Sequence, residues 1–407
     1  MKEKVKVPEL RFDGFTDDWE ERKLGDVGNT FTGLTGKTKE DFGHGSAKFV
    51  TYVNVFQNPI ATLDQLDAIE IDEKQNQVQK GDIFFTTSSE TPEEVGMSSV
   101  WTHDTENVYL NSFTFGYRPR VSFDLNYMAS MLRSPSIRKK IMFLAQGISR
   151  YNISKTKMLE IEIPTPTLSE QEKIGSFFKQ LDNTIALHQR KLDLLKEQKK
   201  GYLQKMFPKN VEKVPELRFA GFADDWEERK FSDFTKLSQG LQIAISDRFT
   251  EAGPNKEFYI TNEFLNPNNT KKYYIENPSK NVIANTNDIL MTRTGNTGKV
   301  VTNTKGAFHN NFFKIDYDPK KISKLFLYFL LTSIPIQKEI LIRAGTSTIP
   351  DLNHKDFYKI KVYLPIFEEQ QRIGSFFKQL DDTIALHQRK LDLLKEQKKG
   401  FLQKMFV

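Results

Sequence analysis

The sequence contains two pairs of nearly identical segments, and this duplication constrains the fold more than any other feature. Residues 7–23 recur as residues 214–230 with 15 identities in 17 positions. Residues 169–207 recur as residues 368–406 with differences at five of 39 positions. The stretches between them share almost no sequence. An internal repeat of this kind indicates one scaffold used twice, here holding two dissimilar inserts.

The order of the shared segments is cyclic. The second long segment ends near the C-terminus in the letters QKMF, and in the first copy the same letters are soon followed by VPELRF. Joining Val407 to Met1 would recreate that junction. This order predicts pseudo-twofold symmetry with neighbouring chain ends.

Each long shared segment has the apolar period of a coiled-coil helix, because its apolar residues step alternately by four and three positions. Ser169 and Glu172 have the spacing of a capping box that would start the first helix, and Pro208 would stop it. The rod from Ile174 to Met206 would measure about 50 Å. The seam residues are Ile174, Phe178, Leu181, Ile185, Leu192 and Leu195, with Ile373, Phe377, Leu380, Ile384, Leu391 and Leu394 in the second copy.

A helix with so narrow an apolar stripe requires a partner helix. The second long shared segment has the same stripe and is the expected partner. A perpendicular twofold axis would make the pair antiparallel, whereas a parallel pair is the alternative. His188 and Lys199 lie on the first seam, and His387 and Lys398 on the second. We interpret these residues as setting the register or extending to solvent rather than as chemically active.

Both inserts alternate short β-branched or aromatic runs with turns, then become helical, and end in a polar segment with one strand before proline. This pattern predicts an α+β fold with mixed α/β layers: two globular domains and two long pairing helices. We expect the first domain in residues 1–168 and its helix in residues 169–208. The second domain would occupy residues 209–367, and its helix residues 368–407.

The composition excludes several kinds of site. The 407 residues include no cysteine, which removes disulfides, thiolate zinc sites and cysteine nucleophiles. The six histidines include no pair at i,i+4 spacing, so we expect no metal site. The GLTGKT run at 33–38 lacks the first P-loop glycine, because Phe31 stands there. We therefore expect a binding protein with no catalytic residues.

The longest apolar stretch, Leu325 to Leu331, is far shorter than the roughly 20 residues that a membrane helix requires. We therefore expect a cytoplasmic protein.

Each insert carries two polar segments that are candidates for contact with nucleic acid. Short hydrogen-bonding side chains and glycine suit contact with base edges or phosphates, although an ordinary polar hairpin has the same composition. The candidates in the first insert are Thr87, Ser88, Ser89, Arg118, Arg150, Tyr151, Asn152 and Lys155. Those in the second insert are Arg293, Thr294, Asn296, Thr297, Asn353, His354 and Lys355.

Most of the net positive charge lies outside the inserts. The chain carries a formal charge of +6, of which residues 169–207 contribute +3 and residues 368–406 contribute +2. Cations that bind an acidic partner must therefore act locally. Besides the residues above, the local cations are Arg120, Arg138, Lys139 and Lys140 in the first insert and Lys271, Lys272, Lys299 and Arg343 in the second.

With these residues identified, the sequence resembles the specificity (S) subunit of type I restriction-modification systems over essentially its whole length. The motifs that carry the resemblance are residues 161–166 (IEIPTP), Glu170-Gln171 with Ile174, and Glu369-Gln370 with Ile373. The second copy departs from the pattern at Leu364-Pro365, which lacks a second proline.

The resemblance implies that the helices form an antiparallel coiled coil that acts as a ruler. It implies that each insert is a target-recognition domain reading one half of an asymmetric bipartite site in double-stranded DNA. The implied partners are two modification (methyltransferase) subunits, which bind S-adenosylmethionine and methylate adenine, and two restriction subunits, which use ATP and Mg. No cofactor is expected on this chain itself. The alternative is a non-catalytic two-domain adaptor that binds protein or carbohydrate ligands.

Overall fold

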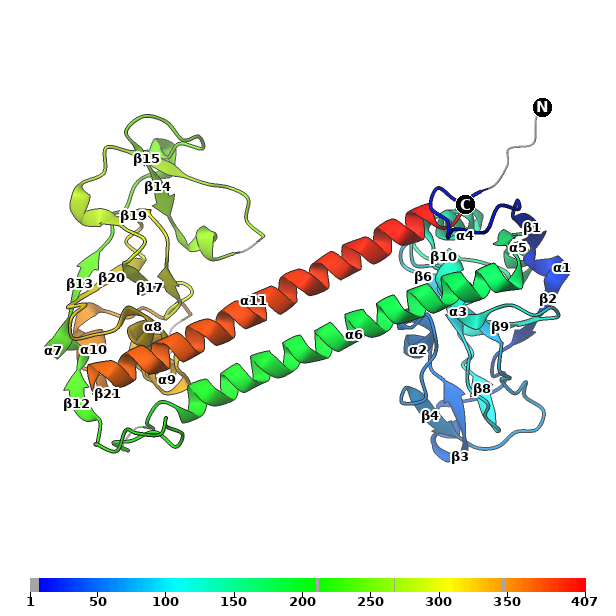
Figure 1. The fold of residues 1–407 in the computed structure, drawn as a ribbon, viewed down its shortest axis with the longest axis horizontal. Coiled ribbons are helices and arrows are strands. Elements are labelled where there is room, and N and C mark those ends of the chain that lie inside the picture. Colours follow the sequence, from blue (N-terminus) through cyan, green and yellow to red (C-terminus); the bar gives the residue numbers. More distant parts are fainter. Residues whose placement is uncertain (1–6, 210–211, 267, 346–347) are drawn as a thin grey trace. The chain divides into compact units, whose positions relative to one another are not determined.

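The computed structural model describes residues 7–209, 212–266, 268–345 and 348–407. The chain forms two compact units. Unit 1 comprises the residues up to Gln189 together with Arg389–Val407, and unit 2 comprises Arg190–Gln388. The long helices α6 (Leu168–Lys205) and α11 (Phe367–Lys404) each contribute one part to unit 1 and the other part to unit 2 (Figure 1).

Unit 1 contains an antiparallel sheet, a mixed sheet and two strand pairs. The antiparallel sheet has the order β2-β9-β5-β7, formed by Gly28–Thr32, Thr114–Pro119, Ile83–Thr86 and Ser98–Val100. The mixed sheet has the order β4-β3-β8, formed by Leu66–Ile69, Phe42–Val50 and Val108–Leu110. The pairs are β1 (Glu20–Lys23) with β11 (Glu162–Thr165), and β6 (Ser88–Ser89) with β10 (Tyr151–Asn152). The shorter helices are α1 (Leu24–Val27), η1 (Lys39–Asp41), α2 (Tyr52–Gln57), α3 (Leu125–Met131), α4 (Pro135–Leu144) and α5 (Lys155–Leu159).

Unit 2 repeats this plan. Its antiparallel sheet has the order β13-β20-β17-β18, formed by Thr235–Gln239, Phe312–Tyr317, Ile289–Thr292 and Val300–Thr302. A second sheet has the order β15-β14-β19-β16, formed by Tyr274–Glu276, Lys256–Ile260, Gly306–Phe308 and Ile283–Ala284, and β12 (Glu227–Lys230) pairs with β21 (Lys361–Leu364). The shorter helices are α7 (Phe231–Phe234), η2 (Ile245–Asp247), η3 (Asn262–Leu265), η4 (Lys280–Val282), α8 (Lys324–Thr332), α9 (Ile334–Ala344) and α10 (His354–Tyr358). The expected α+β class with two related domains is confirmed.

Strand β5 contains consecutive apolar residues because both of its faces are buried. Successive side chains of a strand point to opposite faces. Ile83 and Phe85 enter one hydrophobic core, and Phe84 enters another. In unit 2, β17 divides its side chains in the same way, with Ile289 and Met291 on one side and Leu290 on the other. Each central strand is therefore buried on both faces.

The predicted cyclic closure is confirmed in detail. In unit 1, the Leu10 amide donates to the Lys404 carbonyl at 2.9 Å, and residues 405–406, which follow α11, are buried in the core. In unit 2, the Leu217 amide donates to the Lys205 carbonyl at the same distance. The same contact therefore occurs twice. In unit 2 it joins neighbouring parts of the continuous chain, and in unit 1 it joins the two ends of the chain.

The helix pair is antiparallel within each unit. In unit 1, Lys398 of α11 pairs with Asp182 of α6, and Phe401 contacts Phe177. In unit 2, Lys199 of α6 pairs with Asp381 of α11, and Tyr202 contacts Phe376. Residue numbers therefore fall along one helix as they rise along the other. The two seam lysines each neutralise an aspartate of the facing helix, which agrees with a role in setting the register.

The seam residues differ in what they pack against. Ile174 and Phe178 belong to the globular core of unit 1, and Ile373 and Phe377 to that of unit 2. The other seam residues lie further along the helices: Leu192, Leu195, Leu391 and Leu394 are buried, whereas Leu181, Ile185, Leu380 and Ile384 are partly exposed.

The predicted capping box at the start of α6 is wrong. The helix begins at Leu168, and the Glu170 amide donates to the Thr167 hydroxyl at 3.4 Å, so Thr167 is the capping residue. Ser169 therefore already lies inside the helix. The neighbouring Glu170 carboxylate binds Arg11, whose Nε and Nη2 donate to it at 2.7 and 2.8 Å.

Within the described residues, no single helix has the length and apolar composition of a membrane span, and only the pair α8 and α9, bent by 62°, has them together.

Gly175 lets α6 lie directly against the first turn of α3. A Cβ at this position would approach the Asp124 Oδ1 atom to 2.0 Å and the Tyr127 amide nitrogen to 2.7 Å. Gly374 stands in the same relation to Leu325 and α8 in unit 2. The shared helices therefore dock on the inserts through glycine.

We predict opposite effects for two alanine substitutions on the long helices of unit 1. Gly175→Ala should lower the free energy of unfolding by about 1–3 kcal/mol, because the added methyl group has no space. Gly400→Ala should raise it by about 0.5–1 kcal/mol, because a Cβ there meets nothing within 4 Å and alanine favours helix. Urea unfolding followed by circular dichroism measures both changes. Equal stability of the two variants would contradict the docking role of Gly175.

Candidate nucleic-acid interface

Three segments meet in each unit, and we call their meeting point the three-segment junction. In unit 1 it comprises Tyr52 of α2, the hairpin 87–97 and residues 149–153. The Tyr52 hydroxyl donates to the Ser88 carbonyl at 3.2 Å, and β6 pairs with β10. In unit 2 it comprises Asn262 of η3, the hairpin 293–299 and residues 350–354. Here the Asn262 amide donates to the Thr294 carbonyl at 3.1 Å, and Thr294 forms a bridge with Asp351.

The junction of unit 1 joins candidates that are far apart in the sequence. Asn152 lies opposite Ser88 in the strand pair, and Tyr151 lies opposite Ser89. The Arg150 Nη2 atom donates to the Ser88 hydroxyl at 3.1 Å. The two polar segments chosen from the sequence are therefore neighbouring strands, with Thr87 at their edge and Lys155 at the start of α5.

The junction of unit 2 brings its candidates together through Arg293. The Arg293 Nη2 atom donates to the Asp351 carboxylate at 2.7 Å, and the Leu352 amide donates to the Arg293 carbonyl at 2.8 Å. The Thr297 hydroxyl donates to the Pro350 carbonyl at 2.7 Å. Asn296 is exposed in the same hairpin, and Lys355 is exposed on α10.

Three buried polar atoms near this junction have no hydrogen-bond partner among the described residues: Asn262 Oδ1, Arg293 Nε and His354 Nε2. The His354 ring packs edge-on against Phe313 at 4.6 Å, and burial, with the nearby Arg293 charge, lowers the pKa of His354. Unpaired buried polar atoms are costly and infrequent. The junction therefore retains hydrogen-bonding capacity that the described chain does not use.

Two candidates have other partners. Arg118 lies outside the junction and donates to both oxygens of the buried Asp82 carboxylate, each at 2.7 Å. Asn353 caps α10, because its side chain accepts from the Asp356 amide at 2.9 Å and donates to the Asp356 carboxylate. Both side chains thus have structural roles.

Arg138 holds the hairpin of unit 1 in place. Its guanidinium donates to the carbonyls of Glu93, Val95 and Gly96 at 2.6–2.7 Å. Burial lowers the pKa of Arg138 to about 10, which still leaves it charged at neutral pH. Arg138 is therefore a positioning residue of the hairpin. Gln337 takes its place in unit 2 and donates to the Gly298 carbonyl at 2.8 Å.

Sequence reasoning missed Tyr52 and Asn262. Each follows a threonine at the end of a β-run, in KFVTY and EFYITN respectively. Aligning these two runs would have placed both residues at one equivalent position. Their contacts with the hairpin could not be read from either run alone.

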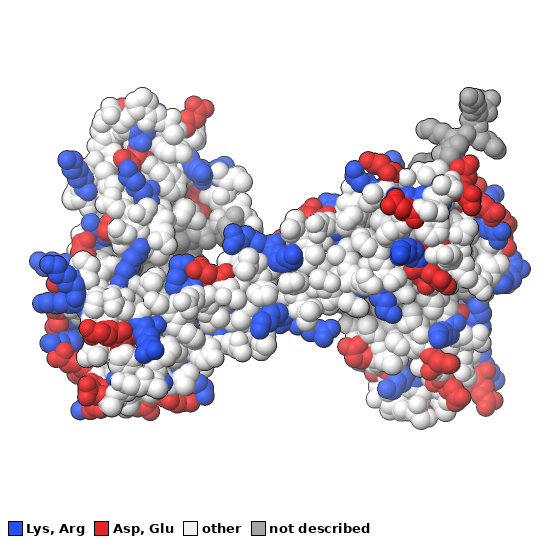
Figure 2. Space-filling model, in the orientation of Figure 1, with Lys and Arg blue, Asp and Glu red and all other residues white. Residues whose placement is uncertain are grey.

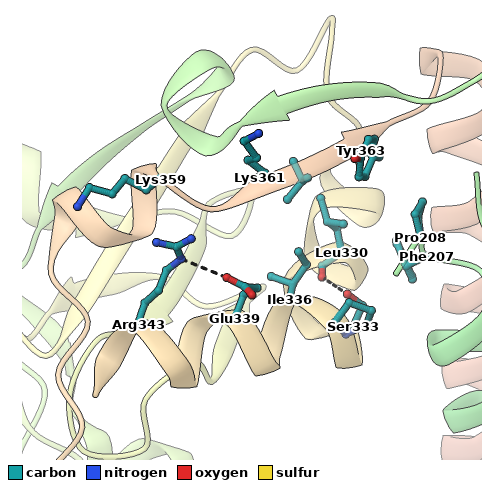
Figure 3. A pocket seen from close by; sticks show the side chains of 12 residues that line it. Phe207, Pro208, Leu330, Ser333, Ile336, Glu339, Arg343, Lys359, Lys361 and Tyr363 are labelled. Atoms are coloured by element: carbon teal, nitrogen blue, oxygen red, sulfur yellow. Dashed lines mark hydrogen bonds and ion pairs between the residues drawn. The ribbon is translucent and has the colours of Figure 1, made fainter. Parts of the chain in front are cut away.

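Figure 2 shows Lys and Arg side chains interspersed with Asp and Glu on the visible face, without a continuous basic coat. A cavity of about 280 Å³ in unit 2 lies beside α9 and is lined by Phe207, Leu330 and Ile336 together with three cations (Figure 3). These cations are paired within the chain: Arg343 with Glu339, Lys359 with Asp356 and Lys361 with Glu228. The junctions are therefore better candidates for an anionic ligand than this cavity.

The fold and its two junctions define a duplicated binding scaffold, in which one frame presents two different sets of polar side chains. The family described as "Type I restriction modification DNA specificity domain" matches residues 16–197 and 223–396. The chain belongs to this family and is a type I restriction-modification specificity subunit with two target-recognition domains. Specificity subunits are non-catalytic.

Two relatives come from Methanocaldococcus jannaschii. The putative type I restriction enzyme MjaX specificity subunit is 24% identical over 401 residues, covering 95% of this chain and 92% of the relative. The type I restriction enzyme MjaVIII specificity subunit is 24% identical over 291 residues, covering 66% and 67%.

Solved structures share the fold. The type I restriction-modification S subunit from M. genitalium aligns with a TM-score of 0.61 and 17% identity, covering 98% of this chain and 99% of that one. The HsdS subunit from Thermoanaerobacter tengcongensis aligns with a TM-score of 0.51 and 17% identity, covering 95% and 96%. The complete two-domain architecture is therefore common to these proteins.

We predict that Arg138→Met loosens the hairpin of unit 1 without unfolding the unit. The three carbonyls would lose their donor, so amide hydrogen exchange in residues 93–97 should become at least tenfold faster, which corresponds to about 1.4 kcal/mol. Lys139→Met, an exposed neighbour on the same helix, is the control and should leave this exchange unchanged. Equal protection in the two variants would show that Arg138 does not hold the hairpin.

Proposed function

We propose that this chain selects the DNA sequence for a type I restriction-modification complex, with each target-recognition domain reading one half of an asymmetric bipartite site. The observation that supports this most directly is the three-segment junction, which occurs twice in the same frame with different side chains. Unit 1 presents Ser88, Ser89 and Arg150, whereas unit 2 presents Thr294, Asn296 and Thr297. Unlike junctions would read unlike half-sites. The adaptor alternative is not favoured by the family.

The helix pair would set the unread gap between the half-sites. A helix of 38 residues, the length of both α6 and α11, measures about 57 Å along its axis. One turn of DNA is about 34 Å, so this length corresponds to roughly 1.7 turns. The lysine pairs with Asp182 and Asp381 would keep the register of the helices fixed, as a ruler requires.

The partners that we infer are double-stranded DNA, two modification subunits and two restriction subunits. S-adenosylmethionine would bind to the modification subunits, and ATP and Mg to the restriction subunits, with no cofactor on this chain. Such a complex would act in the cytoplasm, on the DNA present there.

Exchanging one insert tests the proposed function. Replacing residues 24–168 with the insert of a related specificity subunit should change one half of the methylated sequence and leave the other half unchanged, because each junction lies within one insert. Single-molecule mapping of methylated adenines in a host carrying the exchanged chain measures the result. The matched control exchanges residues 231–367 and should alter the other half. Changes in both halves, or in neither, would contradict the proposal.

Exposed leucines on the long helices support docking of the modification subunits there. Leu187 of α6 and Leu386 of α11 occupy equivalent positions away from the seam and are 66% and 61% exposed. A second exposed leucine lies one heptad further along each helix, Leu194 on α6 and Leu393 on α11, and neighbouring exposed apolar side chains are typical of a protein interface. We therefore propose one docking site per helix.

Leu187→Glu should abolish binding of one modification subunit, because it places a charge in an apolar contact, and the double variant with Leu386→Glu should bind none. Both changes are on exposed positions and should preserve the fold. Analytical ultracentrifugation of the variants mixed with the modification subunit gives the stoichiometry. Asn183→Glu, at an exposed position of α6, is the control. Full binding by the double variant would exclude these leucines from the interface.

A further inference from the structure

A cleft of about 530 Å³ opens at the three-segment junction of unit 1. Its lining comes from α2, from β6 with the loop that follows it, and from the residues before β10. The residues are Tyr52, Phe56, Ser88, Ser89, Glu90, Glu94, Ser149 and Arg150. The cleft therefore combines an aromatic wall, hydroxyl groups, two carboxylates and one guanidinium.

Serine hydroxyls form hydrogen bonds with two charged side chains of the cleft, Glu94 and Arg150. The Ser89 hydroxyl donates to the Glu94 carboxylate at 3.1 Å, and Arg150 donates to the Ser88 hydroxyl at 3.1 Å. Within the described chain, neither Glu90 nor Glu94 forms an ion pair with a cation. Both carboxylates thus keep acceptor capacity, and Arg150 keeps donor capacity.

The aromatic wall is rigid and uncharged. The rings of Tyr52 and Phe56, one helical turn apart, are stacked at 5.9 Å with an interplanar angle of 15°. Burial raises the pKa of Tyr52, and the nearby Glu94 charge raises it further, so the hydroxyl stays protonated and donates to the Ser88 carbonyl. Arg138 fixes the Glu93–Gly96 backbone, which carries Glu94. The cleft is therefore preorganised, which limits the entropy lost on binding.

Unit 2 has a different chemistry at the equivalent place. Its hairpin, residues 293–299, contains no carboxylate, and Asn262 stands where unit 1 has Tyr52. The arginine and the carboxylate of the unit 2 junction, Arg293 and Asp351, pair with each other, whereas no ion pair joins Arg150 to Glu90 or Glu94 within the described residues.

We propose that the cleft of unit 1 reads a C·G base pair from the major groove, with the Glu90 and Glu94 carboxylates together accepting the single cytosine N4 hydrogen that faces the groove, and Arg150 donating to guanine O6 and N7. This inference rests on the proposed function and adds the identity of one base pair in the half-site that unit 1 would read. Carboxylates accept from cytosine N4, and arginine donates to both acceptors of guanine.

The other base pairs fit this set of groups less well. Guanine or thymine opposite the carboxylates would place two acceptors together without a proton between them. Adenine could donate from N6, but its partner thymine offers Arg150 a single acceptor in place of two. The C·G pair with cytosine toward the glutamates therefore satisfies the most groups.

The experiment uses the full chain with its modification subunits and compares Glu90→Gln/Glu94→Gln with the wild type by single-molecule mapping of methylated adenines. The amides keep the side-chain shape but replace carboxylate acceptors with groups that also donate. We expect preference for C·G at one position of one half-site to fall by about tenfold or more, with the other half-site unchanged. Glu93→Gln is the control, because Glu93 does not line the cleft and contributes its carbonyl to Arg138.

A second variant tests the guanine contact. Arg150→Met should relax the same position as the glutamine variant, since both side chains would read one base pair. Relaxation at two different positions would overturn the assignment, as would a first half-site that contains no C·G pair.

The outcomes also separate this inference from the proposed function. If insert exchange changes one half-site but the glutamine variant keeps the wild-type sequence preference, the cleft does not read the pair and only the inference fails. If insert exchange leaves both halves unchanged, the proposed function fails. A uniform loss of methylation with unchanged preference among the remaining sites would likewise overturn the role of the carboxylates.

Discussion

The structure depends on a buried ion pair that the chain builds twice. Arg11 donates two hydrogen bonds to the Glu170 carboxylate, and Arg218 donates two to the Glu369 carboxylate. Both carboxylates are almost completely inaccessible to solvent. A buried carboxylate that lost its arginine would cost about 3–5 kcal/mol. Each pair therefore holds a short shared segment against the first turn of a long helix. In unit 1, Trp19 adds a third donor to Glu170 at 3.1 Å.

This frame allows the inserts to diverge. The shared segments meet the inserts through Gln171, which accepts from the Asp124 amide, and through Gln370, which accepts from the Ser323 amide. Because these contacts use backbone amides of the inserts, the insert side chains can change without breaking them. The hairpins of the junctions are held instead by insert residues such as Arg138 and Gln337, and their exposed side chains are free to differ.

Much of the architecture was predictable because it depends on local periodicity and on repetition. The long helices, the alternation of strands with turns and the cyclic closure follow from such signals. The start of α6 was predicted wrongly, because Ser169 has the composition of a cap but Thr167, two residues earlier, accepts the hydrogen bond from the Glu170 amide. Arg118 and Arg138 were named from sequence as local cations, and the structure adds that they donate to Asp82 and to the carbonyls of residues 93, 95 and 96, contacts that the sequence does not reveal. Whether the junction residues contact DNA stays a prediction.

The sequence by itself determined the duplication, the fold class and the family, because identical segments at long range and heptad spacing can be recognised without coordinates. Only the tertiary structure decided that residue 88 lies opposite residue 152 and that Tyr52 reaches the same hairpin. Such contacts join segments separated by tens of residues, and nothing in their local composition encodes the pairing. The cleft that holds Glu90, Glu94 and Arg150 forms only because the fold brings together α2, the hairpin and the residues before β10.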